Sequence, residues 1–186
     1  MVRREAAEGM DASARKALLQ AELTGVLRGA SEVEVLNSPD WNGADAPLVA
    51  QLRLRVALSA LQRKQLAQQV FQAGETALFP ASTRANAIDF RYPWQEADEV
   101  RVGLPADIQV EKLAPDDSLS IGYARYRIRH KQEDPHKLYS RRDLIIGTGL
   151  VLSDKYKDTK DFFDKIHTDD NQPTVLQPSP SATVTK

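Results

Sequence analysis

Alternation of apolar and polar positions is the main structural signal in this chain, and it predicts strands in several places. In Leu48–Leu58, leucine, alanine and valine occupy every second position, and polar Gln51, Arg53 and Arg55 lie between them. A helix would scatter these residues around its circumference, so the period of two predicts a strand with one buried face. Shorter alternating runs predict further strands over residues 31–36, 88–93, 98–105, 108–113 and 173–177.

The second half of the chain predicts two long strands closed by a helix. Ile121–His130 places alanine, tyrosine and isoleucine on one side and three arginines on the other. Lys131–Pro135 is polar and ends in proline, which is typical of a turn, and Lys137–Leu152 becomes apolar again. Ser153 or Asp154 is the expected cap of the closing helix, 154–167. The apolar residues of that helix are Tyr156, Phe162, Phe163 and Ile166.

Three further segments decide the domain organisation. Asp11–Leu27 predicts a helix, because its leucines recur at helical spacing and either Asp11 or Ser13 can cap it. We interpret residues 1–30 as an N-terminal helical segment, either packed on the β domain or left from an upstream domain. Leu61–Ala73 is ambiguous: its composition slightly favours a helix, and its position between strands favours a strand. Residues 178–186 predict a disordered tail.

Strands separated by turns, without regular strand–helix alternation, argue against a parallel α/β sheet. The prediction is a mainly β fold, either a β-sandwich or an open antiparallel sheet, with an N-terminal helix and a C-terminal helix. The antiparallel β domain is expected to span residues 31–177.

The composition excludes several classes of function. The chain has 186 residues, 41% hydrophobic and 27% charged, which is ordinary for a soluble globular domain. A net charge of −1 gives no overall attraction to nucleic acid or anionic membrane, so neither partner is expected. No apolar run approaches the roughly 20 residues of a membrane span, and Met1–Gly9 lacks the apolar core of a signal peptide. The absence of cysteine excludes a thiolate nucleophile, a disulfide or cysteine-ligated zinc in this chain.

Basic side chains on the predicted hairpin form one candidate binding surface. A strand face of this kind can bind phosphate or an acidic sugar. The favoured alternative is a solvated face balanced by carboxylates such as Glu133 and Asp143, because the net charge of the chain is close to zero. The candidate residues are Arg125, Arg127, Arg129, Arg141, Arg142 and Tyr139.

Tryptophans and paired carboxylates are further candidates. Trp41 and Trp94 lie in predicted loops, where they either stack on a sugar ring or, as we favour, plug the end of the core. General acid–base chemistry needs two carboxylates that face one substrate. We interpret Asp116–Asp117 and Asp169–Asp170 as solvated turn residues instead.

The histidines give no clear metal site. His130 and His136 flank the predicted turn, but a metal site needs three or four converging ligands. Exposed turn histidines are therefore expected, and neither a metal nor a cofactor. His167 suits the C-terminal end of the closing helix, where a cation is favourable.

The order of several short motifs resembles a known family. The runs are R-x-x-x-I-x-F-x-Y-P from Arg84 to Pro93, D-x-V-x-V-x-L-P from Asp98 to Pro105, V-x-x-L at Val110 and Leu113, and the closing residues Tyr156, Phe162 or Phe163, Asp169 or Asp170, and Val175–Leu176. This succession resembles the C-terminal β domain of bacterial exported transglutaminase-like proteins, over about Ala46–Gln177.

In that family the β domain follows a papain-like core with a Cys nucleophile, a His base and an Asp orienter. This chain has no cysteine, so no catalytic residue carries over, and Ala87 stands where the family often has proline. The resemblance implies a non-catalytic accessory or structural domain, with a transglutaminase-like domain or protein as its partner. It also implies export, and it suggests the last domain of such a protein, from a truncated gene, a split gene or a mispredicted start.

Two other functions stay open. One is a free-standing binding module for an extracellular glycan or protein, which predicts a concave surface lined by aromatic residues. The other is a hydrolase that uses carboxylates, for which the sequence gives no positive sign. The accessory domain instead predicts an exposed apolar patch where a neighbour docks.

Overall fold

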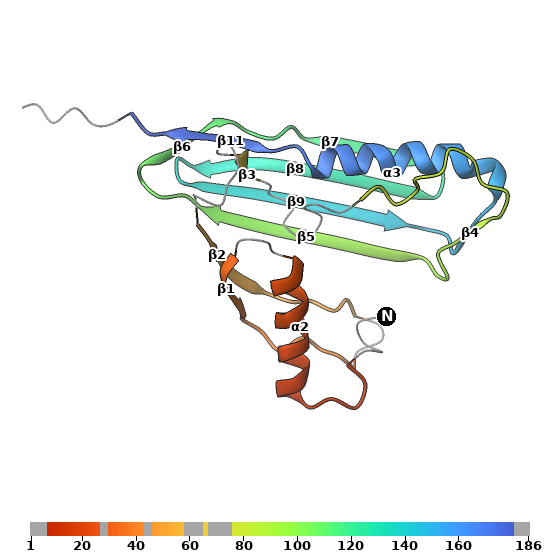
Figure 1. The fold of residues 1–186 in the computed structure, drawn as a ribbon, viewed down its shortest axis with the longest axis horizontal. Coiled ribbons are helices and arrows are strands. Elements are labelled where there is room, and N and C mark those ends of the chain that lie inside the picture. The colour runs from red at the N-terminus through yellow and green to blue at the C-terminus, as the bar shows by residue number, and fades with distance from the viewer. Residues whose placement is uncertain (1–6, 27–29, 43–45, 58–64, 67–75, 181–186) are drawn as a thin grey trace, which may run out of the picture. The chain divides into compact units, whose positions relative to one another are not determined.

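The computed structural model describes residues 7–26, 30–42, 46–57, 65–66 and 76–180. The chain divides into two compact units, Met1–Gln62 and Arg63–Lys186. Antiparallel strands dominate the described residues, which also include one α-helix in each unit (Figure 1). The predicted mainly β fold with an N-terminal and a C-terminal helix is therefore confirmed. In the described part of the chain, no helix is both long enough and apolar enough to cross a bilayer.

The first unit is a helix packed on a two-stranded sheet. Helix α2 (Ala12–Val26) starts as predicted, with the backbone N–H of Ala14 donating to Asp11 Oδ1 at 2.8 Å. Strand β1 (Ala30–Val35) pairs with β2 (Leu52–Val56), and α2 packs against β1. These strands, expected in the β domain, therefore group with the helix.

Strand β2 is shorter than the alternation over 48–58 predicts. The Asn37 side chain donates to the carbonyl of Val49 at 2.8 Å and accepts the N–H of Gln51 at 2.7 Å. The backbone before Leu52 is thus bonded to a side chain, and regular pairing begins only at Leu52.

A four-stranded antiparallel sheet forms the centre of the second unit, in the order β5-β9-β8-β7. Two-residue turns at 122–123 and 135–136 connect β7 to β8 and β8 to β9. The predicted strand 121–130 is therefore wrong at its start, where Ile121 ends β7. The predicted turn 131–135 is mostly strand, because β8 continues to Asp134. The strands are β5 (Trp94–Gly103), β7 (Asp117–Ile121), β8 (Ala124–Asp134) and β9 (Lys137–Ile146).

Two smaller sheets complete the second unit. Strand β11 (Thr174–Pro178) lies between β3 (Gln65–Leu66) and β6 (Ile108–Lys112). The slight preference for a helix over 61–73 is therefore wrong at Gln65 and Leu66, and the rest of that segment lies outside the described residues. The predicted disordered tail, 178–186, is wrong at its start, because Pro178 ends β11 and the N–H of Ser179 donates to the carbonyl of Asp107 at 2.8 Å. Residues 181–186 lie outside the described residues.

Strand β4 (Ile88–Asp89) pairs with β10 (Leu150–Val151) and is shorter than predicted. Arg91 has a φ of 66°, and its N–H donates to Asp89 Oδ1 at 2.7 Å. This local turn stops the strand that the alternation over 88–93 predicts. Gly149 passes close by, since a Cβ there would lie 3.1 Å from the carbonyl oxygen of Arg91.

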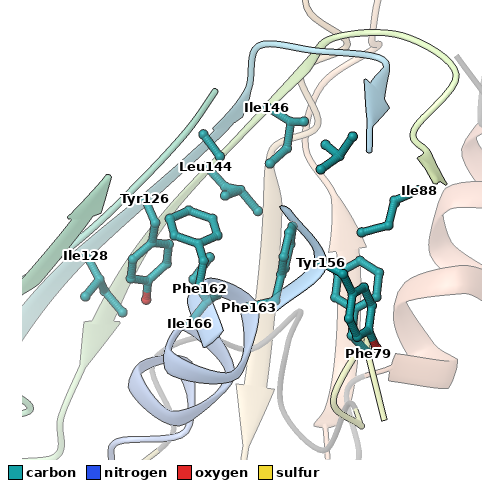
Figure 2. Close-up of a cluster of buried hydrophobic side chains, with 12 residues drawn as sticks. Phe79, Ile88, Tyr126, Ile128, Leu144, Ile146, Tyr156, Phe162, Phe163 and Ile166 are labelled. Atoms are coloured by element: carbon teal, nitrogen blue, oxygen red, sulfur yellow. The ribbon is translucent and has the colours of Figure 1, made fainter. Parts of the chain in front are cut away.

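Helix α3 (Tyr156–Asp170) packs against β7 and β8 (Figure 1). A 3-10 turn, η3 (Ser153–Lys155), leads into it, and no side chain caps either element, so the predicted cap at Ser153 or Asp154 is wrong. Figure 2 shows the aromatic residues of the helix facing the apolar residues of the sheet. The ring of Phe163 lies 5.3 Å from Phe79 and 5.4 Å from Phe162, centroid to centroid.

Replacing Phe163 by alanine is expected to lower the free energy of unfolding by about 3–5 kcal/mol, because the ring leaves a cavity that its aromatic neighbours cannot fill. Urea denaturation measures this loss. The control is Leu152→Ala, at a position 61% exposed, which should change stability by less than about 0.5 kcal/mol. Equal losses in the two variants would contradict the position of the core.

Candidate functional site

Buried charges gather where the end of α3 meets the sheet. The side chains of Arg142, on β9, and Asp170, the last residue of α3, are each 4% exposed. Arg142 Nε donates to both carboxylate oxygens of Asp170 at 3.0 Å. The hydroxyl of Tyr126 donates to Asp170 Oδ1 at 2.8 Å, and the Arg142 guanidinium lies 5.7 Å from the centre of the Tyr126 ring. Two donors therefore hold the Asp170 carboxylate.

The same arginine reaches the edge strand β5. Its Nη1 lies 2.9 Å from Glu96 Oε2 and 3.5 Å from Asp98 Oδ2. Arg142 thus connects three elements, β5, β9 and α3, through one guanidinium. We call Arg142, Asp170, Tyr126, Glu96 and Asp98 the Arg142 cluster.

Burial and neighbouring charges both shift the pKa values of the Arg142 cluster. Burial raises the pKa of Asp170, although Arg142 and Tyr126 act in the opposite direction. Burial alone would lower the pKa of Arg142, but the charges of Asp170 and Glu96 outweigh it and raise that pKa. Burial, reinforced by the charge of Asp170, also raises the pKa of Tyr126. Because Asp170 is both buried and bonded, the cluster suits a structural role rather than proton transfer to a substrate.

These contacts correct the interpretation of one carboxylate pair, whereas Asp116 of the other pair is exposed. Asp169 and Asp170 are buried at the end of α3, not solvated in a turn. Asp116 accepts the backbone N–H of His130 at 2.7 Å. Lys165 Nζ lies 2.6 Å from Asp117 and also bonds Asp169, which ties α3 to β7.

The prediction that Arg142 belongs to the exposed basic surface is wrong, because its side chain is buried. It shares its strand face with Ser140 and Leu144, both buried. The sequence contained this signal, because positions 138, 140, 142, 144 and 146 follow one period of two. The partner of Arg142 could not be identified from the sequence, because Asp170 lies on a separate helix.

The three histidines lie in different environments. His130 is 8% exposed within β8, so the expected exposed turn residue is wrong there, while His136 is half-buried in the turn. Burial lowers the pKa of His130, with Asp116 opposing. His167 lies in the last turn of α3, as predicted. Among the described residues, no three His, Asp or Glu side chains converge to hold a metal.

The candidate basic surface lies on the exposed face of the sheet. Arg141 donates to Asp143 at 2.9 Å and to Glu99 at 2.8 Å, as expected for a balanced face. Tyr139 lies on the same face, with the Arg101 guanidinium 5.0 Å from its ring centre. No ion pair among the described residues includes the three remaining arginines, Arg125, Arg127 and Arg129.

The two tryptophans belong to different units. The predicted loop is wrong at Trp94, which begins β5; the side chain is half-buried and packs against the hydrophobic core, as the plugging interpretation requires. Trp41 is also half-buried, with the guanidinium of Arg15 6.0 Å from its ring centre. Both rings therefore already have protein contacts.

Comparison with protein-family models matches residues 61–176 to the family described as a Domain of Unknown Function with solved-structure structure (DUF3858). The match spans more than half of the chain and includes the whole Arg142 cluster. Neither a curated protein nor a solved structure matches the chain.

Replacing Arg142 by methionine is expected to lower the free energy of unfolding by about 3–5 kcal/mol at pH 7.5, because Asp170 stays buried without its cation. Loss of the guanidinium raises the pKa of Asp170 further, so the folded variant takes up a proton more readily than its unfolded chain. The loss should therefore shrink between pH 7.5 and 5, as measured by urea denaturation.

Two variants control that experiment. Arg141→Met, on the exposed face one position away, should cost no more than about 1 kcal/mol. Arg142→Met combined with Asp170→Asn should cost less than the sum of the single changes. Additive losses would show that the two side chains are not coupled.

His130 is expected to make stability depend on pH. Its folded pKa lies below the ordinary 6.5, so on acidification the unfolded chain binds a proton that the buried imidazole does not. The free energy of unfolding should fall as pH drops below 6.5, by at most about 1.4 kcal/mol per pH unit. Denaturation at pH 7.5 and 5.5 measures this change in the natural chain and in His130→Gln. A slope unchanged in the variant would assign the effect to other groups.

Proposed function

The chain belongs to the DUF3858 family, and we propose that it is a non-catalytic accessory β domain that docks on a transglutaminase-like catalytic domain or protein. The motif order between Arg84 and Leu176 supports this partner through its resemblance to the β domain of such proteins. One structural observation carries the proposal: three leucines stand exposed around one end of the hydrophobic core.

Leu78, Leu150 and Leu152, which we call the leucine set, are 59%, 56% and 61% exposed. Leu150 and Leu152 flank the buried Val151, and Leu78 directly precedes the buried Phe79. Each leucine is thus adjacent in sequence to a member of the same core cluster. Figure 2 shows the Phe79 end of this cluster, with Ile88 and Tyr156 beside it.

Covering these side chains would be favourable. Full burial of a leucine contributes about 1.5–3 kcal/mol, so even partial burial of three adds usefully to association. Apolar residues in the centre of an interface are the usual source of such energy. A folded partner that presents an apolar surface therefore fits the leucine set better than a soluble sugar does.

The buried ionisable groups support a role without catalysis. Asp170 and Arg142 bond each other, and Lys165 joins Asp169 to Asp117. These groups hold α3 against the sheet. The nucleophile of a papain-like core would be a cysteine, and the 186-residue sequence contains none.

Binding to a transglutaminase-like protein encoded in the same genome tests the proposal. The full chain and that protein are mixed, and the complex is measured by calorimetry and by size-exclusion chromatography with light scattering. Leu150→Asp combined with Leu152→Asp should weaken binding by at least about 30-fold, because two carboxylates would be desolvated in an apolar contact.

The matched control is Leu36→Asp combined with Val49→Asp, two apolar residues of the first unit that are 45% and 51% exposed. This variant should bind within about twofold of the natural chain. Absence of any complex with transglutaminase-like proteins of that genome would remove the proposal. Equal weakening by both double variants would remove the leucine set as the docking surface.

A further inference from the structure

Four cations follow one another along the exposed side of β8. Arg125, Arg127, Arg129 and Lys131 occupy alternate positions, all exposed, while Ala124, Tyr126, Ile128 and His130 between them are buried. We call these four cations the basic strip. Alternate residues on a strand lie about 6.7 Å apart, so the strip is a regular row of positive charge.

The described residues provide no counter-ion for the strip. Among the described residues, none of its members forms an ion pair, whereas other cations on the same face do. The nearest cross-strand carboxylate is Asp143, opposite Arg127, and Arg141 already binds it through two hydrogen bonds at 2.9 Å. The positive charge of the strip is therefore available to a ligand.

Two serines extend the strip onto the edge strand β7. Ser118 pairs with Arg127 and Ser120 with Arg125 in the antiparallel register. All four side chains are exposed, and they help to line one depression on this surface. Each row thus offers a guanidinium and a hydroxyl side by side, and both can donate to a carboxylate.

We propose that the basic strip binds an extended acidic polypeptide segment that carries a carboxylate at every second residue. Such a segment repeats its side chains at the same spacing of about 6.7 Å, so successive carboxylates meet successive rows. Charge complementarity supplies the attraction, and the spacing supplies the selectivity. This surface is separate from the leucine set and goes beyond the proposed function.

The aromatic side chains of this face favour a peptide over nucleic acid or sugar. Single-stranded nucleic acids and sugars bind on open aromatic rings. Tyr139 is the aromatic residue opposite Lys131 in the register, and the Arg101 guanidinium already lies over its ring. The described residues of this face therefore offer a row of cations but no uncovered aromatic ring, which suits a flexible peptide that carries carboxylates.

Fluorescence anisotropy with the full chain tests this inference. The probe is a labelled ten-residue peptide of alternating Glu and Thr. Two control peptides have the same length, one with Gln in place of Glu and one with five Glu followed by five Thr. Binding of the alternating peptide should be several-fold tighter than that of the block peptide, and should weaken as salt is added. The Gln peptide should not bind.

Amino-acid substitutions test whether the peptide binds to the basic strip. Arg125→Gln combined with Arg127→Gln should weaken binding about tenfold, and Ser118→Ala combined with Ser120→Ala about threefold. The matched control is Arg53→Gln combined with Arg55→Gln, two strand arginines that already pair with Glu34 and Glu32. It should change binding by less than twofold. Thermal unfolding followed by circular dichroism confirms that each variant is folded.

The inference would be overturned by equal binding of the alternating and block peptides, by equal weakening by both arginine pairs, or by tighter binding of a heparin fragment or an oligothymidylate through the same arginines. The leucine variants of the docking experiment should bind the peptide normally. A chain that binds its transglutaminase-like partner but not the peptide would overturn this inference alone. The reverse would overturn the proposed function alone.

Discussion

The bond between Arg142 and Asp170 is the contact on which the arrangement of the second unit depends. It joins the last residue of α3 to the centre of the sheet, and the same guanidinium reaches Glu96 on the edge strand. A carboxylate at the C-terminal end of a helix is unfavourable by itself, because the helix dipole is negative there. Arg142 reverses this effect by bonding both carboxylate oxygens, and Tyr126 donates a further hydrogen bond to Oδ1. Once this end is fixed, Phe162 and Phe163 meet the apolar face of the sheet.

The same alternation that buries Arg142 exposes the basic strip. Neighbouring residues of a strand point to opposite faces, so Tyr126 and Ile128 enter the core while Arg125, Arg127 and Arg129 face outward. The buried arginine is neutralised by carboxylates from other elements, which are brought to it by tertiary packing. The outward arginines lie opposite residues of the neighbouring strands β7 and β9. The carboxylate among these residues, Asp143, is bound by Arg141. The charges of the buried face are therefore paired within the protein, whereas Arg125, Arg127 and Arg129 form no ion pair among the described residues.

Much of the fold could be predicted because it depends on local pattern. Alternation identified the strand faces around Tyr126, and capping by Asp11 located the start of α2. The errors occurred where a single side chain or backbone angle overrides the pattern. Asn37 replaces strand pairing before Leu52, and the positive φ of Arg91 ends β4. For the site, the exposed arginines could be predicted, but the burial of Asp169 and Asp170 could not, because two adjacent acids near a helix end usually remain in water.

The class of fold, the inward and outward faces of the long strands, and the lack of a cysteine nucleophile all follow from the amino-acid sequence, because periodicity and composition do not depend on which distant residues meet. The pairing of the charges, in contrast, depends on tertiary packing. Arg142 and Asp170 are 28 residues apart, and Arg142 and Glu96 are 46 apart. No local rule relates such positions, because their contact depends on how α3 and β5 pack against the strand between them. Tertiary packing therefore makes one arginine part of the core and leaves its neighbours on the surface.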